Sequence, residues 1–191
     1  MTRADSNSLQ IAWIESPVGL LRAGASDTAL HLLEFAAADS TQALPSASTP
    51  LLEQTRRELA EYFAGTRRRF EVPVSFPGSP FQERVWTALC SIGYGERISY
   101  LEQSRRVGDE KGATHASHGQ ARERCPGSPV SGRTPAQKAI RAVAQANGQN
   151  PIAIIVPCHR VINSDGKLGG YGGGLLRKQF LLDLERGDRL L

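Results

Sequence analysis

Short apolar runs separated by polar turns open the chain, a pattern that is typical of strands. The runs Ile11–Ile14 and Leu20–Ala23 flank Ser16–Gly19, which contains the proline and glycine of a tight turn. A third run covers Leu30–Phe35, and Phe70–Val74 is a fourth apolar segment. We therefore predict four strands in this part of the chain.

Between the third and fourth of these runs, apolar residues recur at the spacing of an α-helix. Thr49-Pro50 combines a capping residue with a proline at the first helical position. The helix that follows would end at Gly65, with one face formed by Leu52, Leu59, Tyr62 and Phe63. Strands with a single helix predict a small α+β domain over residues 1–78.

The remaining residues, 79–191, follow a mostly helical pattern and form a second predicted domain. Helices are expected after Ser79-Pro80, from Tyr100, after Thr134-Pro135 and from Leu175. The third of these would turn small residues to the core, namely Ala139, Ala142, Val143 and Ala146. Successive helices with short connections are typical of a helix-turn-helix domain. The apolar run Ile152–Val156 is predicted to be a buried strand.

An unpatterned segment, at about residues 109–133, interrupts this second domain. A structureless stretch of roughly 25 residues inside a compact domain is uncommon. Its basic residues would either add phosphate contacts or have no role. His115, His118 and Cys125 lack a fourth ligand for structural zinc, so we predict no metal.

Composition places the protein among globular chains, with 40% hydrophobic and 22% charged residues in 191. The longest apolar stretch, Pro151–Val156, is far too short to span a membrane. No signal peptide is visible, and three cysteines without framework spacing suit a reducing compartment. We expect a cytoplasmic protein.

Charge is unevenly divided between the two predicted domains. Residues 1–78 hold 7 Lys and Arg against 9 Asp and Glu, whereas residues 79–191 hold 16 against 10. The surplus positive charge therefore lies in the second domain. Such a distribution favours nucleic acid as a partner, although a solvated arginine-rich surface would look the same.

Candidate chemistry centres on Pro157-Cys158-His159-Arg160, which directly follows the apolar run. Nearby positive charge lowers the pKa of a thiol, and a histidine oriented by a carboxylate can accept its proton. Cys158 is thus a candidate nucleophile, and the alternative is a buried structural cysteine. Cys90, on the apolar face of a predicted helix, fits that structural role.

The second domain resembles the O6-alkylguanine-DNA alkyltransferases, also called methylated-DNA–protein-cysteine methyltransferases. The resemblance covers nearly all of residues 79–187 outside the insert. The motifs that carry it are Ser79-Pro80-Phe81-Gln82, Ile98-Ser99-Tyr100, Arg141-Ala142-Val143, Asn150-Pro151, Pro157-Cys158-His159-Arg160-Val161 and Gly170-Tyr171-Gly172-Gly173. It implies a ribonuclease-H-like N-terminal domain and a winged helix-turn-helix-like C-terminal domain.

The resemblance also implies a chemistry and its residues. Cys158 would take an alkyl group from O6 of guanine, once per molecule and without a cofactor. His159 would accept the thiol proton through a water, Glu185 would hold His159, and Asn150 would tie the active-site turn.

The implied partner is double-stranded DNA that contains O6-alkylguanine, approached from the minor groove by a monomer. The target base would be turned out of the stack. Arg141 would fill the vacated space, and the small residue Ala142 would let its helix enter the groove. Substrate and DNA contacts are also expected from Tyr100, Arg160, Val161, Tyr171 and Gly172. O4-alkylthymine is a second expected substrate.

The chain departs from the family pattern beyond the insert. Gln103 and Ser104 stand where an apolar and a small residue are usual, which puts the packing of that helix in question, and Gly93 replaces a common proline. Two other functions stay open. One is a protein that binds alkyl lesions without activity, and the other is a thiol hydrolase that uses Cys158, His159 and Glu185.

Overall fold

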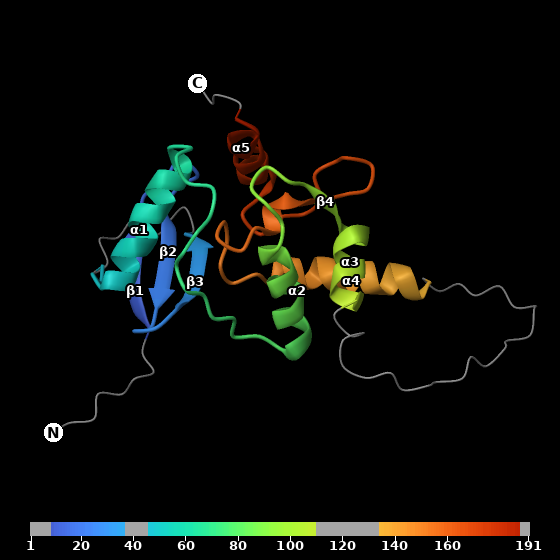
Figure 1. The fold of residues 1–191 in the computed structure, drawn as a ribbon, viewed down its shortest axis with the longest axis horizontal. Coiled ribbons are helices and arrows are strands. Elements are labelled where there is room, and N and C mark those ends of the chain that lie inside the picture. Colours follow the sequence, from blue (N-terminus) through green and yellow to red (C-terminus); the bar gives the residue numbers. More distant parts are fainter. Residues whose placement is uncertain (1–8, 37–45, 110–133, 188–191) are drawn as a thin grey trace, which may run out of the picture.

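The structure is a computed structural model that describes residues 9–36, 46–109 and 134–187. Figure 1 shows two parts side by side. A small sheet and one helix form the N-terminal part, coloured blue to teal, and a group of helices forms the C-terminal part, coloured green to red. The predicted α+β class, a small sheet domain followed by a helical domain, is confirmed.

Three antiparallel strands in the order β1-β2-β3 form the sheet. Their bounds are β1 Gln10–Ile14, β2 Leu21–Ala25 and β3 Leu30–Phe35. The turn between β1 and β2 closes with a 2.9 Å hydrogen bond from Gly19 N to Ser16 O. Gly19 adopts a φ of +100°, which a residue without a Cβ tolerates. All three strands lie where the sequence predicts them.

Helix α1 spans Pro50–Phe63 and lies against the sheet (Figure 1). The Thr49 side chain caps it by accepting a hydrogen bond of 3.3 Å from Leu52 N. Its inner face is fully buried at four positions: Leu52, Thr55, Glu58 and Tyr62. The helix thus closes the N-terminal core and directs the end of its Tyr62 ring toward the C-terminal part.

The predicted strand over Phe70–Val74 is wrong. Only Val74 forms a single bridge, parallel to Leu30 of β3. Leu30 N donates to Pro73 O at 2.8 Å, and Ser75 N donates to Leu30 O at 3.0 Å. Because Pro73 has no N–H to donate, a regular ladder cannot extend through this segment.

In residues 79–109 and 134–187, the described C-terminal part, there are four α-helices, a short parallel pair of strands and one 3₁₀ turn. Capping boxes at Ser79 and Thr134 begin two of the helices, as the sequence predicts. The elements are α2 Pro80–Cys90, β4 Ile98–Ser99, α3 Tyr100–Asp109, α4 Pro135–Gly148, η2 Cys158–Arg160, β5 Val161–Ile162 and α5 Leu175–Arg186.

Helix α4 packs with a narrower inner face than its sequence predicts. Val143 and Ala146 are buried as expected, but Ala139 and Ala142 are exposed. The inner face is completed instead by Asn147, which is 6% exposed. A polar residue with a buried partner therefore joins Val143 and Ala146 on the inner face, whereas Ala139 and Ala142 do not.

The apolar run Ile152–Val156 is buried, but it is not the predicted strand. Its backbone turns on itself, with hydrogen bonds from Val156 N to Ile152 O at 3.0 Å and from Ile155 N to Ala153 O at 2.8 Å. Ile154 takes a φ of +70°, which a β-branched residue rarely adopts. Strand propensity is overridden here by a turn that places the residues after Val156.

Two hydrogen bonds join this turn to the N-terminal sheet. Leu33 N donates to Pro151 O at 2.8 Å, and Ala153 N donates to Leu33 O at 2.7 Å. The edge of β3 thereby continues into the C-terminal part. Within the three described ranges, no helix is long and apolar enough to cross a membrane.

Candidate active site

Cys158 begins the 3₁₀ turn η2, immediately after the buried turn of residues 152–156. Its side chain is held by Asn150, whose Nδ2 lies 3.1 Å from Sγ and donates at 2.8 Å to Val156 O. Asn150 Oδ1 in turn accepts a hydrogen bond of 3.0 Å from Ile152 N. One side chain therefore fixes both ends of the turn and the sulfur beyond it.

Burial raises the pKa of the Cys158 thiol, although the Asn150 hydrogen bond and the positive charge of Lys178 act in the opposite direction. Neighbouring positive charge from Lys178 thus lowers the pKa as expected, but the net shift is upward. The desolvation of a thiol that is only 8% exposed outweighs both favourable contacts. At neutral pH the group is a thiol, so nucleophilic attack requires a base.

His159 has the properties of that base. Its ring is completely buried, and Nε2 lies 2.9 Å from Oε1 of Glu185. Burial lowers the pKa of His159 despite the neighbouring carboxylate, so the ring is neutral near pH 7. With Nε2 donating to Glu185, Nδ1 is left as an acceptor, and it is buried without a partner among the residues placed in the structure.

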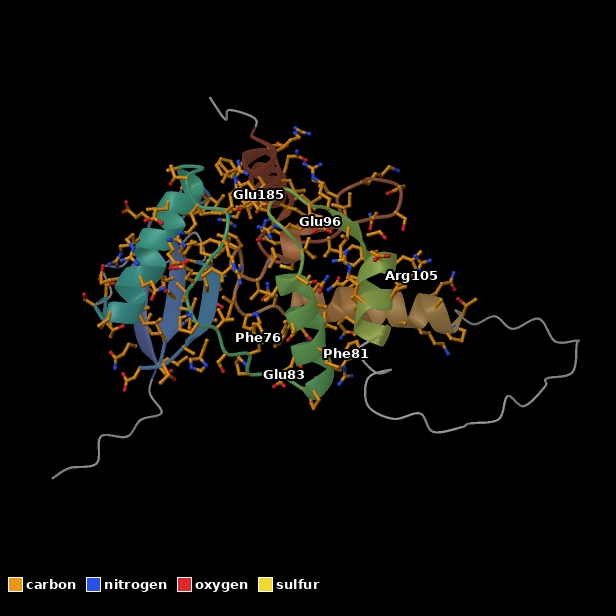
Figure 2. The ribbon with its side chains drawn as sticks, viewed as in Figure 1. Phe76, Phe81, Glu83, Glu96, Arg105 and Glu185 are labelled. Carbon is orange, nitrogen blue, oxygen red and sulfur yellow. The ribbon has the colours of Figure 1, made fainter. Side chains whose placement is uncertain are left out.

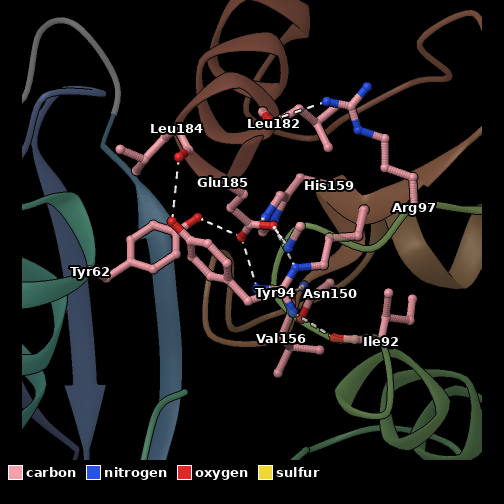
Figure 3. A network of polar contacts seen from close by, with 12 residues as sticks. Tyr62, Ile92, Tyr94, Arg97, Asn150, Val156, His159, Leu182, Leu184 and Glu185 are labelled. Carbon is pink, nitrogen blue, oxygen red and sulfur yellow. Dashed lines mark hydrogen bonds and ion pairs between the residues drawn. The ribbon is translucent and has the colours of Figure 1, made fainter. Parts of the chain in front are cut away.

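Glu185, on α5, is the centre of a buried polar network (Figure 3). Tyr62 donates to Oε1 at 2.8 Å, and Gly95 N donates to Oε2 at 3.1 Å. Arg160 donates from Nε and a terminal nitrogen, each at 2.8 Å. Burial alone would raise the pKa of Glu185, but the hydrogen bonds from His159 and Arg160 outweigh it and hold the pKa well below its usual range.

Arg160 and Val161, which the sequence predicts to contact substrate or DNA, are both buried. The Arg160 guanidinium is buried against Glu185 and also donates to Ile92 O at 2.6 Å. The Val161 side chain is fully buried in β5, which pairs with β4. An arginine that satisfies a buried carboxylate and a carbonyl has few donors left for phosphate.

Two cavities reach Cys158 from different sides. The first, of about 380 Å³, is bordered by Tyr100 on α3, by Ile140 and Ala144 on α4, and by the glycine-rich loop. The second, of about 270 Å³, opens beside β3. Asn147, Gly148, Tyr171 and Gly172 line both, and Tyr100 donates at 3.3 Å to Gly170 O. The predicted residues Tyr100, Tyr171 and Gly172 thus gather around the sulfur.

Arg141 and Ala142 lie on the exposed side of α4. Together with Lys138 and Gln145 they line a shallow surface hollow of about 280 Å³. The neighbouring Ile140 lines the larger Cys158 cavity, so the same helix borders the thiol and presents a basic surface.

Two residues that the sequence assigned no site role contact this centre. Tyr62 reaches Glu185 from the N-terminal part, although the helical spacing of apolar residues predicted only a core position for it. Lys178 on α5 is fully buried, and its Nζ donates to Val161 O at 2.6 Å and Gly169 O at 3.3 Å. Burial lowers the pKa of Lys178 to about 8.

Cys90 does not have the buried structural role that its helix position predicted. It is the last residue of α2, it is exposed, and it lines a separate cavity of about 550 Å³ beside Tyr94 and Arg160. In the described part of the chain, no cluster of three or more metal-ligating side chains occurs. His115, His118 and Cys125 lie outside the described residues, as does most of the predicted insert.

Comparison with known families matches both parts of the chain. Residues 10–76 match the model of the 6-O-methylguanine DNA methyltransferase ribonuclease-like domain. Residues 80–187 match the model of the 6-O-methylguanine DNA methyltransferase DNA-binding domain. Between them the two models account for most of the sequence.

Individual relatives agree with this match. A methylated-DNA–protein-cysteine methyltransferase of Mycolicibacterium paratuberculosis is 41% identical over 179 residues, covering 91% of this chain and 90% of that protein. A protein of the same name from Methanosarcina barkeri is 35% identical, with coverage of 92% and 96%. The crystal structure of Mycobacterium tuberculosis OGT in complex with DNA superposes with a TM-score of 0.70 at 37% identity, covering 93% of each chain.

Proposed function

The chain belongs to the 6-O-methylguanine DNA methyltransferase family, and on this basis we propose that it removes alkyl groups from O6 of guanine in double-stranded DNA. The acceptor is Sγ of Cys158. The observation that carries this assignment is a buried thiol at the end of a cavity, adjoining a neutral histidine with a free acceptor nitrogen and an oriented donor nitrogen.

The reaction is a single displacement at the alkyl carbon. The bond between Sγ and that carbon forms as the bond from the carbon to O6 breaks. His159 Nδ1 takes the thiol proton through a bridging water, and this proton ends on the released guanine. The product is a thioether, which does not hydrolyse, so each molecule reacts once and needs no cofactor.

Delivery of the base requires it to leave the helical stack, because O6 is inaccessible to Cys158 inside a duplex. Tyr100, Tyr171 and Gly172 would contact the extruded base, since they border the larger cavity. Arg141 would occupy the vacated space from the minor groove, with Ala142 beside it on the exposed side of α4. O4-alkylthymine is proposed as a second substrate.

We also propose how the chain is divided into domains, its oligomeric state and its location in the cell. Residues 1–78 and 79–191 are assigned to two domains that act together as a monomer. The free thiols of Cys90 and Cys158 suit a reducing compartment, and the cytoplasm is the proposed location.

Mass spectrometry of the intact protein tests the function. The chain is incubated with duplex DNA containing O6-methylguanine and then digested for peptide mapping. One added methyl group on Cys158, saturating at one per molecule, is the expected result. Tight binding of the lesion without a mass change would instead indicate a non-enzymatic lesion-binding protein, and continuous turnover of a small ester would indicate a thiol hydrolase.

A further inference from the structure

Gln103, one of the departures from the family pattern, is fully buried on α3. Its amide exchanges two hydrogen bonds with Asn147 on α4. Gln103 Nε2 donates to Asn147 Oδ1 at 2.9 Å, and Asn147 Nδ2 donates to Gln103 Oε1 at 2.7 Å. An apolar residue at position 103 would leave the Asn147 amide buried without its partner, which is costly.

Asn147 stands at the end of α4, where the helix meets the site. Its backbone oxygen accepts a hydrogen bond of 3.2 Å from Asn150 N. Asn150 is the residue whose Nδ2 lies 3.1 Å from Cys158 Sγ. A continuous series of hydrogen bonds therefore runs from Gln103 through Asn147 and Asn150 to the sulfur.

The end of α4 also forms part of the cavity walls. Asn147 and Gly148 line both cavities that reach Cys158. The preceding turn is fixed from α2, because Trp86 Nε1 donates to Ala146 O at 2.9 Å. Trp86 holds the helix backbone, whereas Gln103 holds the side chain that faces the next helix.

From this arrangement we infer that Gln103 is a positioning residue for alkyl transfer. By fixing Asn147 it sets the position of Asn150 and hence of the Cys158 sulfur relative to the base cavity. The inference rests on the proposed function and adds to it a residue that acts through others, without contact with the substrate.

The test compares Gln103→Met with Ser104→Ala at a temperature well below the melting point of both. Met keeps the length of the side chain and removes both hydrogen bonds. Ser104 is a matched control because its hydroxyl bonds only within α3, to Leu101 O. Rates are measured with free O6-benzylguanine and with duplex O6-methylguanine.

We expect Gln103→Met to slow alkyl transfer about tenfold on both substrates, because a small displacement of reacting atoms is costly. Its affinity for undamaged duplex should stay within about twofold of the wild type, since the exposed face of α4 is unchanged. Ser104→Ala should react at the wild-type rate. A lower melting temperature with unchanged transfer rates would reduce Gln103 to a structural role and overturn the inference.

If Gln103→Met does not fold, a double variant that exchanges the two amide residues tests the same inference. Gln103→Asn alone shortens one side of the pair and should slow transfer. Adding Asn147→Gln restores the combined length and should recover most of the rate. An exchanged pair that folds but is no faster than Gln103→Asn would contradict the inference.

A measurement independent of DNA separates this inference from the proposed function. Labelling of Cys158 by iodoacetamide, resolved by peptide mapping, should be slower in Gln103→Met because a displaced Asn147 moves Asn150 and weakens its hydrogen bond to the sulfur. Unchanged labelling would overturn the positioning role. Failure of the wild-type protein to take an alkyl group from DNA would contradict the proposed function alone.

Discussion

Tyr62 on α1 donates a hydrogen bond of 2.8 Å to Oε1 of Glu185 on α5, across 123 positions of the sequence. Figure 3 shows the Tyr62 phenol approaching the carboxylate from the N-terminal side, and Figure 2 labels Glu185 beside α5. Because the same oxygen contacts His159, the N-terminal domain takes part in orienting the candidate base.

Replacing Tyr62 with Phe removes this hydrogen bond and leaves the ring in place. We expect the free energy of unfolding to fall by about 1–2 kcal/mol, because the acceptor is a buried carboxylate that keeps its other donors. Urea denaturation measures the change. Tyr94→Phe is the control, since its hydroxyl makes only a 3.4 Å contact with Leu184 O and should change stability little. Equal losses in both variants would contradict the assigned role of Tyr62.

Replacing Cys158 with Ser should abolish alkyl transfer and leave affinity for the lesion largely intact. A hydroxyl is a far weaker nucleophile than a thiol, and the cavity walls are unchanged. Cys90→Ser, at the exposed thiol, is the matched variant and should transfer at the wild-type rate. Transfer measured by protein mass and lesion binding measured by fluorescence anisotropy separate the two effects. Wild-type transfer by the Cys158 variant would exclude that sulfur as acceptor.

The pH profile of the reaction with free O6-benzylguanine tests His159 as the base. Burial lowers the pKa of His159 and raises that of Cys158, so the neutral base and the thiol coexist over a wide range. The wild-type rate should fall as acid protonates the ring and should change little above neutrality until about pH 8, where Lys178 loses its charge. His159→Gln must rely on free thiolate, so its rate should rise about tenfold per pH unit. If the rates of the wild type and of His159→Gln depended on pH in the same way, proton transfer to His159 would be contradicted.

Arg141→Ala should slow repair of duplex DNA much more than reaction with the free base. The side chain lies on the exposed side of α4, and only a stacked base has to be extruded and replaced. Arg56→Ala on α1 is a charge-matched control, because Arg56 is half-buried and paired with Glu53 in the N-terminal part. Equal losses by Arg141→Ala on both substrates would contradict a role in base extrusion.

Residue types near the ends of helices and strands were sufficient to predict most of the element boundaries. Ser79 and Thr134 begin their helices with capping boxes, which can be recognised from the residue types alone. Phe70–Val74 and Ile152–Val156 were mispredicted because apolar character indicates burial, whereas strand formation depends on where the backbone hydrogen bonds go. Pro73 and the turn at Ile154 send those bonds elsewhere.

The residues of the site could be predicted only where they lie within a recognisable sequence motif. Cys158 and His159 were candidates from their local chemistry, and Glu185 was named only from the family resemblance. The structure brings His159 and Glu185 into contact at the turn that Cys158 begins. Arg160 was expected to contact substrate or DNA because it belongs to the motif that carries the family resemblance. Its real partner lies 25 positions away on α5, and no local pattern encodes such a pairing. The same holds for Gln103 and Asn147.

The junction between β3 and the turn at residues 151–153 limits how this protein can be recombined. Leu33 holds that turn on both sides, and the turn contains Ile154 in a backbone conformation that costs on the order of 1–3 kcal/mol. The two Leu33 hydrogen bonds add to those by which Asn150 holds the turn. We therefore expect a chimera that joins this C-terminal domain to a foreign N-terminal domain to keep the Asn150 contacts and to lose the two bonds from the sheet. The strand that replaces β3 would have to offer a backbone N–H and a carbonyl at the position of Leu33 to restore them.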